Sequence, residues 1–176
     1  MQQKLEKNCL PINFDLDTEY LYNEALKRPR KVFYYPKIGK VEGYHYAPYE
    51  PEWLKDYIQK SFGLKGRWNM KFVYIPSGVV LDWHVDKGTK CAINWLINNS
   101  SASIEFRNGK YQYESAIIDT SKEHRVVDLA GERILFKVSC WDMTYNELCQ
   151  NFIKRYMKKK GRYYIQYTFY QRNQKK

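Results

Sequence analysis

Residues 71–98 read KFVYIPSGVVLDWHVDKGTKCAINWLIN and contain three short runs that are rich in β-branched and aromatic residues. Proline, glycine, serine and aspartate separate these runs, which is typical of short strands joined by turns. No run is long enough to favour a helix over a strand. The stretch therefore predicts consecutive antiparallel strands, and the rest of the chain can be interpreted outward from it.

The same pattern continues as far as residue 141. Further strand-like runs are ASIEFRNG at 102–109, KYQYESAIID at 110–119, HRVVDLAG at 124–131 and RILFKVSCW at 133–141. The dipeptide Asn108–Gly109 lies between two such runs and is a strong signal for a tight hairpin. About seven or eight strands with no helix between them predict an antiparallel sandwich or barrel.

Helical patterns flank this predicted β core. In residues 16–29, Asp17 or Thr18 can cap a helix that ends before Pro29, and residues 51–63 place apolar side chains on one helical face. Thr144 and Glu147 form a capping box before a third helix. Residues 33–49 suggest loops or short strands, and residues 163–170 suggest an added strand.

We expect one domain, mainly β with flanking helices. Its three parts are the N-terminal helices and loops (1–70), the β core (71–142) and a C-terminal helix with a basic strand or tail (143–176). The four cysteines include no CxxC pair, so neither a disulfide framework nor a zinc knuckle is expected. The N-terminus lacks the apolar core of a signal peptide, and no stretch approaches the roughly 18 apolar residues of a membrane span. We therefore expect a cytoplasmic protein.

The chain is strongly basic, with 30 Lys and Arg against 19 Asp and Glu and a net charge of +11. Residues 151–176 contain nine basic residues, six tyrosines or phenylalanines from Tyr156 to Tyr170, and no acidic residue. Basic side chains beside aromatic rings suit nucleic acid or another acidic macromolecule as a partner. A solvated helix end followed by a tyrosine-rich edge strand accounts for the same segment without a partner.

The chemistry of a metal site is indicated by His84 and Asp86, which stand two positions apart in a predicted strand. Side chains at i and i+2 project from the same face of a strand, so an imidazole and a carboxylate would point at one position. His124 is the obvious third ligand, and two histidines with one carboxylate suit non-haem Fe(II). The plain alternative is an exposed turn at Asp86 and a surface histidine at 124. His45 has no partner at ligand spacing, and it either packs among tyrosines or lines a substrate entrance.

Three segments of the chain resemble the Fe(II)- and 2-oxoglutarate-dependent oxygenases, and above all their prolyl-hydroxylase-like branch. These segments are YIPSGVVLDWHVDKG at 74–88, TKCAINWLIN at 89–98 and AIIDTSKEHRVVDLAGERILFKVSCWD at 116–142. The resemblance covers residues 71–142 and implies a double-stranded β-helix, which is a cupin-like jelly roll. It also implies an oxygenase that uses Fe(II), 2-oxoglutarate and O2 and releases succinate and CO2.

The resemblance implies a role for each matching residue. His84, Asp86 and His124 would bind the iron and form the catalytic centre. Arg133 would pair with the distal carboxylate of 2-oxoglutarate, Tyr74 would hydrogen-bond the same carboxylate, and Asn94 could line the pocket. Lys137 competes with Arg133 for the cosubstrate, because some relatives use a lysine; the family's spacing after the distal histidine favours Arg133. The hydroxylated substrate could be a protein residue, an amino acid or a nucleic acid.

Two other functions remain open on the sequence. A cupin-like enzyme could hold Zn(II) or Ni(II) with the same three ligands and use no 2-oxoglutarate, but it would have no need for Arg133. A non-catalytic basic β-barrel could bind nucleic acid through its aromatic and basic side chains. That function would leave the spacing of His84, Asp86, His124 and Arg133 unexplained.

Overall fold

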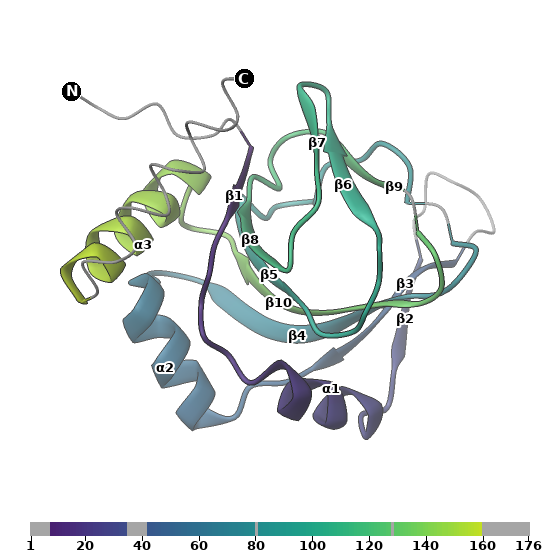
Figure 1. Ribbon diagram of the computed structural model, residues 1–176, viewed down its shortest axis with the longest axis horizontal. Coiled ribbons are helices and arrows are strands. Elements are labelled where there is room, and N and C mark those ends of the chain that lie inside the picture. Colours follow the sequence, from purple (N-terminus) through teal and green to yellow (C-terminus); the bar gives the residue numbers. More distant parts are fainter. Residues whose placement is uncertain (1–7, 35–41, 80, 128, 160–176) are drawn as a thin grey trace.

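The computed structural model describes residues 8–34, 42–79, 81–127 and 129–159, and it contains two antiparallel sheets and three helices in these ranges (Figure 1). The large sheet has the strand order β1 (Cys9–Pro11), β8 (Ser115–Ile118), β5 (Cys91–Leu96), β10 (Arg133–Cys140), β4 (Trp68–Ile75), β3 (Glu42–Pro48) and β2 (Lys31–Tyr34). The small sheet has the order β7 (Gly109–Tyr111), β6 (Ser103–Phe106) and β9 (His124–Val127).

The chain alternates between the two sheets, as a jelly roll requires. From β4 it crosses to an isolated bridge between His84 and His124 at the edge of β9, and then returns to β5. It crosses again to β6 and β7, returns to β8, crosses to β9 and ends the core in β10. The resulting orders, β4-β10-β5-β8 in one sheet and bridge-β9-β6-β7 in the other, define a double-stranded β-helix. The predicted fold class is confirmed.

The strand β10 shows how the large sheet separates two environments. Its even-numbered residues Ile134, Phe136, Val138 and Cys140 belong to a core that also contains side chains of all three helices. Its odd-numbered residues lie on the opposite face of the sheet, because successive side chains in a strand alternate. We call this opposite face, which carries Lys71, Val73, Leu135 and Lys137 and is turned toward the small sheet, the interior face.

The helices form where the sequence predicts them. The helix α1 (Thr18–Leu26) begins after Asp17, whose carboxylate accepts the backbone N–H of Tyr20. The helix α2 (Glu52–Phe62) ends at Gly63, whose φ of 62° favours a residue without a Cβ. Before α3 (Tyr145–Lys159), the Thr144 hydroxyl accepts the N–H of Glu147, and the Glu147 carboxylate accepts the N–H of Thr144.

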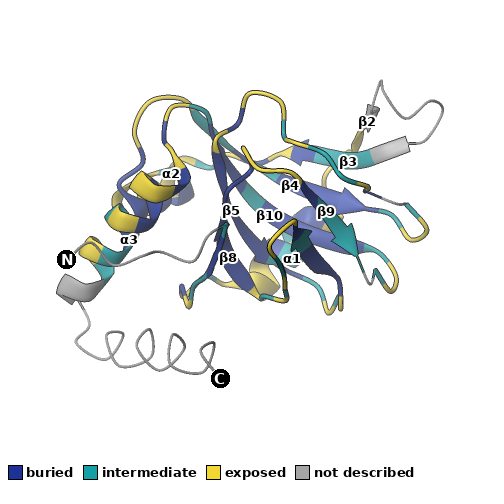
Figure 2. Cartoon of the chain, turned by 90° about the horizontal axis from the view of Figure 1, so that it is seen from above, coloured by how far each residue is buried: buried dark blue, intermediate teal, exposed yellow. Residues whose placement is uncertain are grey.

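The helices cover the large sheet on the side away from the small sheet (Figure 1). Apolar residues of α2 and α3, among them Ile58, Phe62, Leu148 and Phe152, are buried against it. Figure 2 shows the consequence: the central strands are buried, whereas α2 and α3 expose their outer sides. The interior face is thereby left free of helices, and it is where the functional side chains gather.

Some local predictions need correction or lie outside the described residues. The run 79–86 is expected to be a strand, but its described residues, 79 and 81–86, form no strand and contain one isolated bridge, between His84 and His124. Asp82 interrupts the run, and its backbone contacts β9 through this bridge and through the hydrogen bond that the Val126 N–H donates to the Leu81 carbonyl. The predicted strand at 163–170 and most of the basic segment 151–176 fall beyond the described residues, which end at 159. In the described part of the chain, no helix is both long and apolar enough to cross a bilayer.

Candidate metal centre

His84, Asp86 and His124 come together as the sequence predicts. Each offers one ligand atom, and these three atoms lie within 4.8 Å of one another. The Nε2 atom of His84 is 3.6 Å from Oδ1 of Asp86, and the Nε2 atom of His124 is 3.7 Å from the same oxygen. Adjacent ligands of a metal with bonds of about 2.1 Å stand about 3 Å apart, so the three side chains would move closer together to hold one ion.

The backbone fixes the orientation of both imidazoles. Nδ1 of His84 lies 2.6 Å from the carbonyl oxygen of Asp82, and Nδ1 of His124 lies 2.8 Å from that of Lys122. A carbonyl oxygen can only accept, so each Nδ1 carries the proton and donates it. The Nε2 atoms are then left with their lone pairs, which is the tautomer that a metal ligand requires. These two hydrogen bonds hold the imidazole rings in the orientation that metal binding requires.

Lys137 is the closest cation to this group. Its Nζ donates a hydrogen bond of 2.8 Å to Oδ2 of Asp86, the carboxylate oxygen that neither histidine faces. Burial opposes ionisation of Asp86, but the charges of Lys137 and His124 outweigh it and lower the pKa of Asp86 to about 2. Burial likewise favours a neutral Lys137, yet the Asp86 charge raises the pKa of Lys137. Both groups are therefore ionised at neutral pH.

His124 is the most enclosed of the three candidate ligands, with 7% of its side chain exposed. Burial lowers the pKa of His124, and the neighbouring His84 acts in the same direction. A neutral imidazole is the form that binds metal, so little proton competition is expected at neutral pH. The donor set, two neutral nitrogens and one carboxylate, fits a divalent transition metal.

Arg133 is buried on the same side of the sheet as Lys137. Only 1% of the residue is exposed, and its guanidinium lies 5.3 Å from the centre of the Tyr113 ring. Its Nε and Nη2 atoms are buried without a hydrogen-bond partner among the described residues. Burying donors of a charged group without acceptors is costly, so these two atoms mark the place where an anionic ligand would be stabilised.

Asn94 connects the surroundings of Arg133 to those of Lys137. It lies directly opposite Lys137 in the pairing of β5 with β10, so both side chains share the interior face. Its Nδ2 donates a hydrogen bond of 3.0 Å to the Tyr113 hydroxyl, while its Oδ1 is buried without a partner among the described residues. Asn94 thus lies on the interior face beside Lys137, and its role in lining a ligand site stays a prediction.

Tyr74 is not brought to the metal centre, contrary to expectation. It lies on the opposite face of β4, and its hydroxyl donates a hydrogen bond of 2.7 Å to the carbonyl oxygen of Ala25 in α1. The guanidinium of Arg30 covers its ring at 4.0 Å. Its strand register explains the difference, because Tyr74 pairs with Ile134, a member of the helix-covered core. His45 of β3 is the directly opposite partner of Tyr74. Both lie on the helix-covered face of the large sheet, which we call the outer face.

Lys71 and Tyr44 also lie on the interior face, although neither is among the site residues predicted from the sequence. Lys71 lies directly opposite Lys137 in the pairing of β4 with β10, and Tyr44 packs against Val73 and Leu135 on the interior face. Burial raises the pKa of the Tyr44 hydroxyl, and the Asp86 charge adds to the effect. Alternation along β4 would have grouped Lys71 with Val73 and separated both from Tyr74. It could not have shown which group faces the metal centre.

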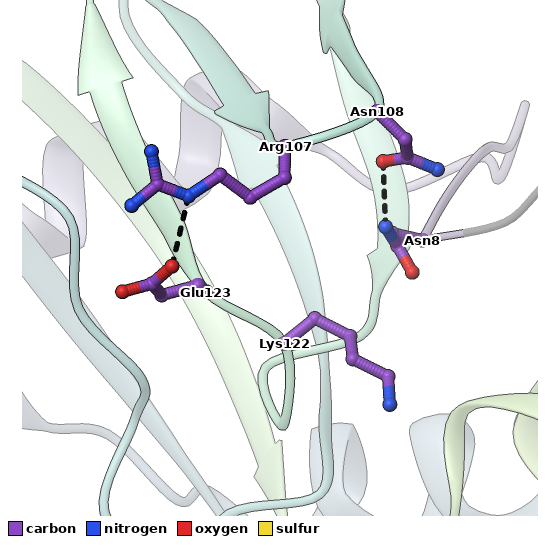
Figure 3. Close-up of a pocket in the computed structure, with 5 residues that line it drawn as sticks. All are labelled: Asn8, Arg107, Asn108, Lys122 and Glu123. Carbon is purple, nitrogen blue, oxygen red and sulfur yellow. Dashed lines mark hydrogen bonds and ion pairs between the residues drawn. The ribbon is translucent and has the colours of Figure 1, made fainter.

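A surface pocket of about 420 Å³ lies close to β9 but is distinct from the metal centre (Figure 3). It is lined by Asn8, Arg107, Asn108, Lys122 and Glu123. Nε of Arg107 donates to Glu123, and the two asparagine side chains bond to each other, so these groups satisfy one another. None of the three candidate metal ligands lines this pocket.

Comparison with known proteins identifies no family. No family model matches the chain, and no curated protein matches it. Among solved structures, a prolyl-4-hydroxylase from Pseudomonas putida is similar with a TM-score of 0.47 and 12% identity over 69% of this chain and 84% of that one. An oxidoreductase of the 2OG-Fe(II) oxygenase family from Burkholderia pseudomallei has a TM-score of 0.45 and 8% identity over 68% and 76% of the two chains.

Structures outside the oxygenases are similar to the same degree. A predicted oxalate decarboxylase from Thermotoga maritima has a TM-score of 0.45 and 12% identity over 66% of this chain and 96% of that one. These likenesses extend to several kinds of jelly-roll protein, and the assignment of the fold rests on the strand order of the chain itself. The chain is a double-stranded β-helix with a His-Asp-His group suited to a metal.

Proposed function

We propose that this protein is an Fe(II)- and 2-oxoglutarate-dependent oxygenase that hydroxylates its substrate. One observation carries the proposal. A metal-ligand group of two histidines and one carboxylate lies on the same side of the large sheet as a buried arginine whose Nε and Nη2 have no acceptor among the described residues. A metal enzyme without an acidic cosubstrate would have no use for that arginine.

The metal ligands fit iron. Two imidazole nitrogens and one carboxylate oxygen form the donor set that non-haem Fe(II) prefers, and they would leave positions on the metal for a cosubstrate and O2. His84, Asp86 and His124 would hold the ion, and the carbonyl oxygens of Asp82 and Lys122 keep the two imidazoles turned toward it. When Fe(II) and 2-oxoglutarate are bound, they supply the oxidising chemistry, with succinate and CO2 as by-products.

Arg133 fits the distal carboxylate of 2-oxoglutarate. A guanidinium presents a planar fork of donors that matches a carboxylate, and a buried carboxylate would satisfy both unpaired nitrogens. Lys137, the other candidate, already donates to the metal ligand Asp86 at 2.8 Å. The contacts therefore favour Arg133 as the residue that binds the distal carboxylate. Lys137 would instead orient the carboxylate of Asp86.

The apolar side chains of the interior face would keep water from the reacting groups. Leu135 lies on the interior face between Arg133 and Lys137, and it belongs to a buried cluster with Val73, Ile75 and Leu81. Excluding water strengthens the ion pairs within the site and protects reactive species from side reactions. The chain would thus contribute ligand geometry, an anion clamp and an apolar surrounding for the reacting groups.

The decisive experiment is an anaerobic titration with Fe(II) and 2-oxoglutarate. Chelation of the metal by the cosubstrate produces a weak visible absorption band, which we expect for the wild type and for Arg125→Met. Arg125 is a matched control because its guanidinium pairs with Glu105 at 2.7 Å outside the interior face. We expect no band in His124→Ala and a much weaker affinity for 2-oxoglutarate in Arg133→Met.

The same titration separates the cupin-like alternative. If the wild type binds the metal but 2-oxoglutarate neither produces the band nor binds by calorimetry, the oxygenase function is wrong. The protein would then be a metal protein of the same fold that uses no 2-oxoglutarate.

A further inference from the structure

Two lysines face each other on the interior face of the large sheet. Lys71 of β4 and Lys137 of β10 are directly opposite partners in the antiparallel register, which places their side chains on the same face and close together. Like charges in such a pair repel, and burial adds a desolvation cost to both. An arrangement of this kind persists only when counter-charges offset the repulsion.

Among the described residues, a carboxylate pairs with Lys137 but none pairs with Lys71. Lys137 is paired with Asp86, but no carboxylate among the described residues lies within ion-pair distance of Lys71. The charge of Asp86 raises the pKa of Lys71, but this effect is smaller than those of burial and of the Lys137 charge. Burial and the charge of Lys137 together lower the pKa of Lys71 to about 8, so the ammonium is still the main form at neutral pH.

The ligands of the proposed function leave Lys71 without a counter-charge. Asp86 already pairs with Lys137 and would also hold the metal, and of the two carboxylates of 2-oxoglutarate one would bind the metal and the other Arg133. A bound metal would add further positive charge near Lys137. An additional anion would therefore offset the charge of Lys71 on the interior face.

We propose that Lys71 binds an anionic group of the primary substrate, a carboxylate or a phosphate, so that the substrate is an acid. This inference rests on the proposed oxygenase function and extends it to the substrate class. Lys71 would act as a specificity residue that orients the acid beside the metal centre. A neutral substrate would leave the ammonium unpaired, and the site would discriminate against it.

Asn69 supports a ligand at the same place. It stands two residues before Lys71 in β4 and therefore projects from the same face. Its Oδ1 is buried without a hydrogen-bond partner among the described residues. An amide that accepts a hydrogen bond beside an ammonium that donates one suits an acid that also carries a hydroxyl or an N–H group.

Binding of small anions to the loaded protein tests the proposal without a known substrate. The protein is loaded with one equivalent of Zn(II), which is redox-inert, freed of excess metal and saturated with 2-oxoglutarate. Saturation is needed because it occupies Arg133 and the metal, leaving Lys71 as the cation under test. Sodium acetate, inorganic phosphate and neutral acetamide are then titrated by calorimetry.

We expect acetate or phosphate to bind the wild type and acetamide not to bind. Lys71→Met should weaken anion binding at least tenfold, whereas Lys71→Arg should retain it because it keeps the charge. Lys90→Met is the matched control, because Lys90 is exposed to solvent. This variant should bind the anions as tightly as the wild type does. The preferred anion identifies whether the substrate is a carboxylic acid or a phosphate ester.

The outcomes distinguish this inference from the proposed function. If 2-oxoglutarate binds but neither anion does, or if Lys71→Met binds anions as the wild type does, the Lys71 subsite is wrong and the oxygenase function stands. If 2-oxoglutarate itself fails to bind, the oxygenase function is wrong. The anion titration is then repeated on the Zn(II)-loaded protein alone, where loss in Lys71→Met supports the subsite and loss only in Arg133→Met overturns it.

Discussion

Lys137 donates a hydrogen bond of 2.8 Å to Oδ2 of Asp86, while the two histidines face the other carboxylate oxygen. Nε2 of His84 and Nε2 of His124 lie 3.6 and 3.7 Å from Oδ1. The ion pair thus sets the rotation of the carboxylate and presents Oδ1 to the position that a metal would take. It also engages the Lys137 ammonium, which favours Arg133 over Lys137 as the clamp for a cosubstrate. This single contact links the geometry of the metal centre to the choice of the anion-binding residue.

The ion pair makes the stability of the metal-free protein depend on Asp86. We expect Asp86→Asn to lower the free energy of unfolding at pH 7 by about 3 kcal/mol, because it leaves Lys137 buried without its counter-charge. Urea unfolding of both proteins in the presence of a chelator measures the difference. A difference below about 1 kcal/mol would show that the pair contributes little.

The same pair predicts a pH dependence. The pKa of Asp86 is lowered from 3.8 to about 2 in the folded state, so its stabilising contribution is complete above pH 3.8 and is lost as the pH falls toward 2. A shift of this size corresponds to about 2 kcal/mol. The stability gap between the wild type and Asp86→Asn should therefore narrow by about 1.5 kcal/mol between pH 5 and pH 2.5, measured by urea unfolding, because about a third of the contribution remains at pH 2.5. A gap of constant size over this range would contradict the assignment.

The two basic residues of β10 should separate in their effect on ligands. We expect Arg133→Met to weaken 2-oxoglutarate binding by at least about thirtyfold, because truncating one partner of a desolvated charge pair costs about 2–5 kcal/mol. Lys137→Met should weaken 2-oxoglutarate binding far less, because its ammonium is already engaged by Asp86. Calorimetry on both variants measures the order of effects, and a reversed order would move the clamp to Lys137.

The three histidines of the chain provide a matched test of the metal site. We expect excess Zn(II) to raise the melting temperature of the wild type and of His45→Gln, because ligands that bind only the folded state stabilise it. His84→Gln and His124→Gln should lose this increase, since each removes one of the three ligands. His45 serves as the control because it lies on the outer face, opposite Tyr74. An equal Zn(II) response in all three variants would place the metal elsewhere.

Tyr74 should matter for stability and not for the cosubstrate. Its hydroxyl donates to the Ala25 carbonyl within the helix-covered core, so Tyr74→Phe should lower the free energy of unfolding by about 1 kcal/mol. Its affinity for 2-oxoglutarate should equal that of the wild type. Denaturant unfolding and calorimetry on the one variant check both statements, and a weaker affinity would return Tyr74 to the site.

The order of most elements and the identity of the candidate metal ligands could be predicted from the sequence because the signals are local. Short β-branched runs between turn residues predicted the β core, and Asp17 and Thr144 marked the starts of two helices through their own hydrogen bonds. The spacing of His84 and Asp86 predicted that they would point the same way. His124 lies beside them because its backbone forms an antiparallel bridge with His84.

The faces of β4 and the pairing of its lysine were decided only by the tertiary structure. From Phe72 to Ile75 every residue of β4 is apolar or aromatic, so both faces of the strand look alike in the sequence. Alternation separates two sets of side chains without showing which set lies on the interior face. The interleaving of two sheets brings β10 beside β4 and sets Lys137 against Lys71, 66 positions apart in the sequence (137 minus 71). The physical reason is that strand register is set by packing across the whole core, and a shift of one residue exchanges the two faces.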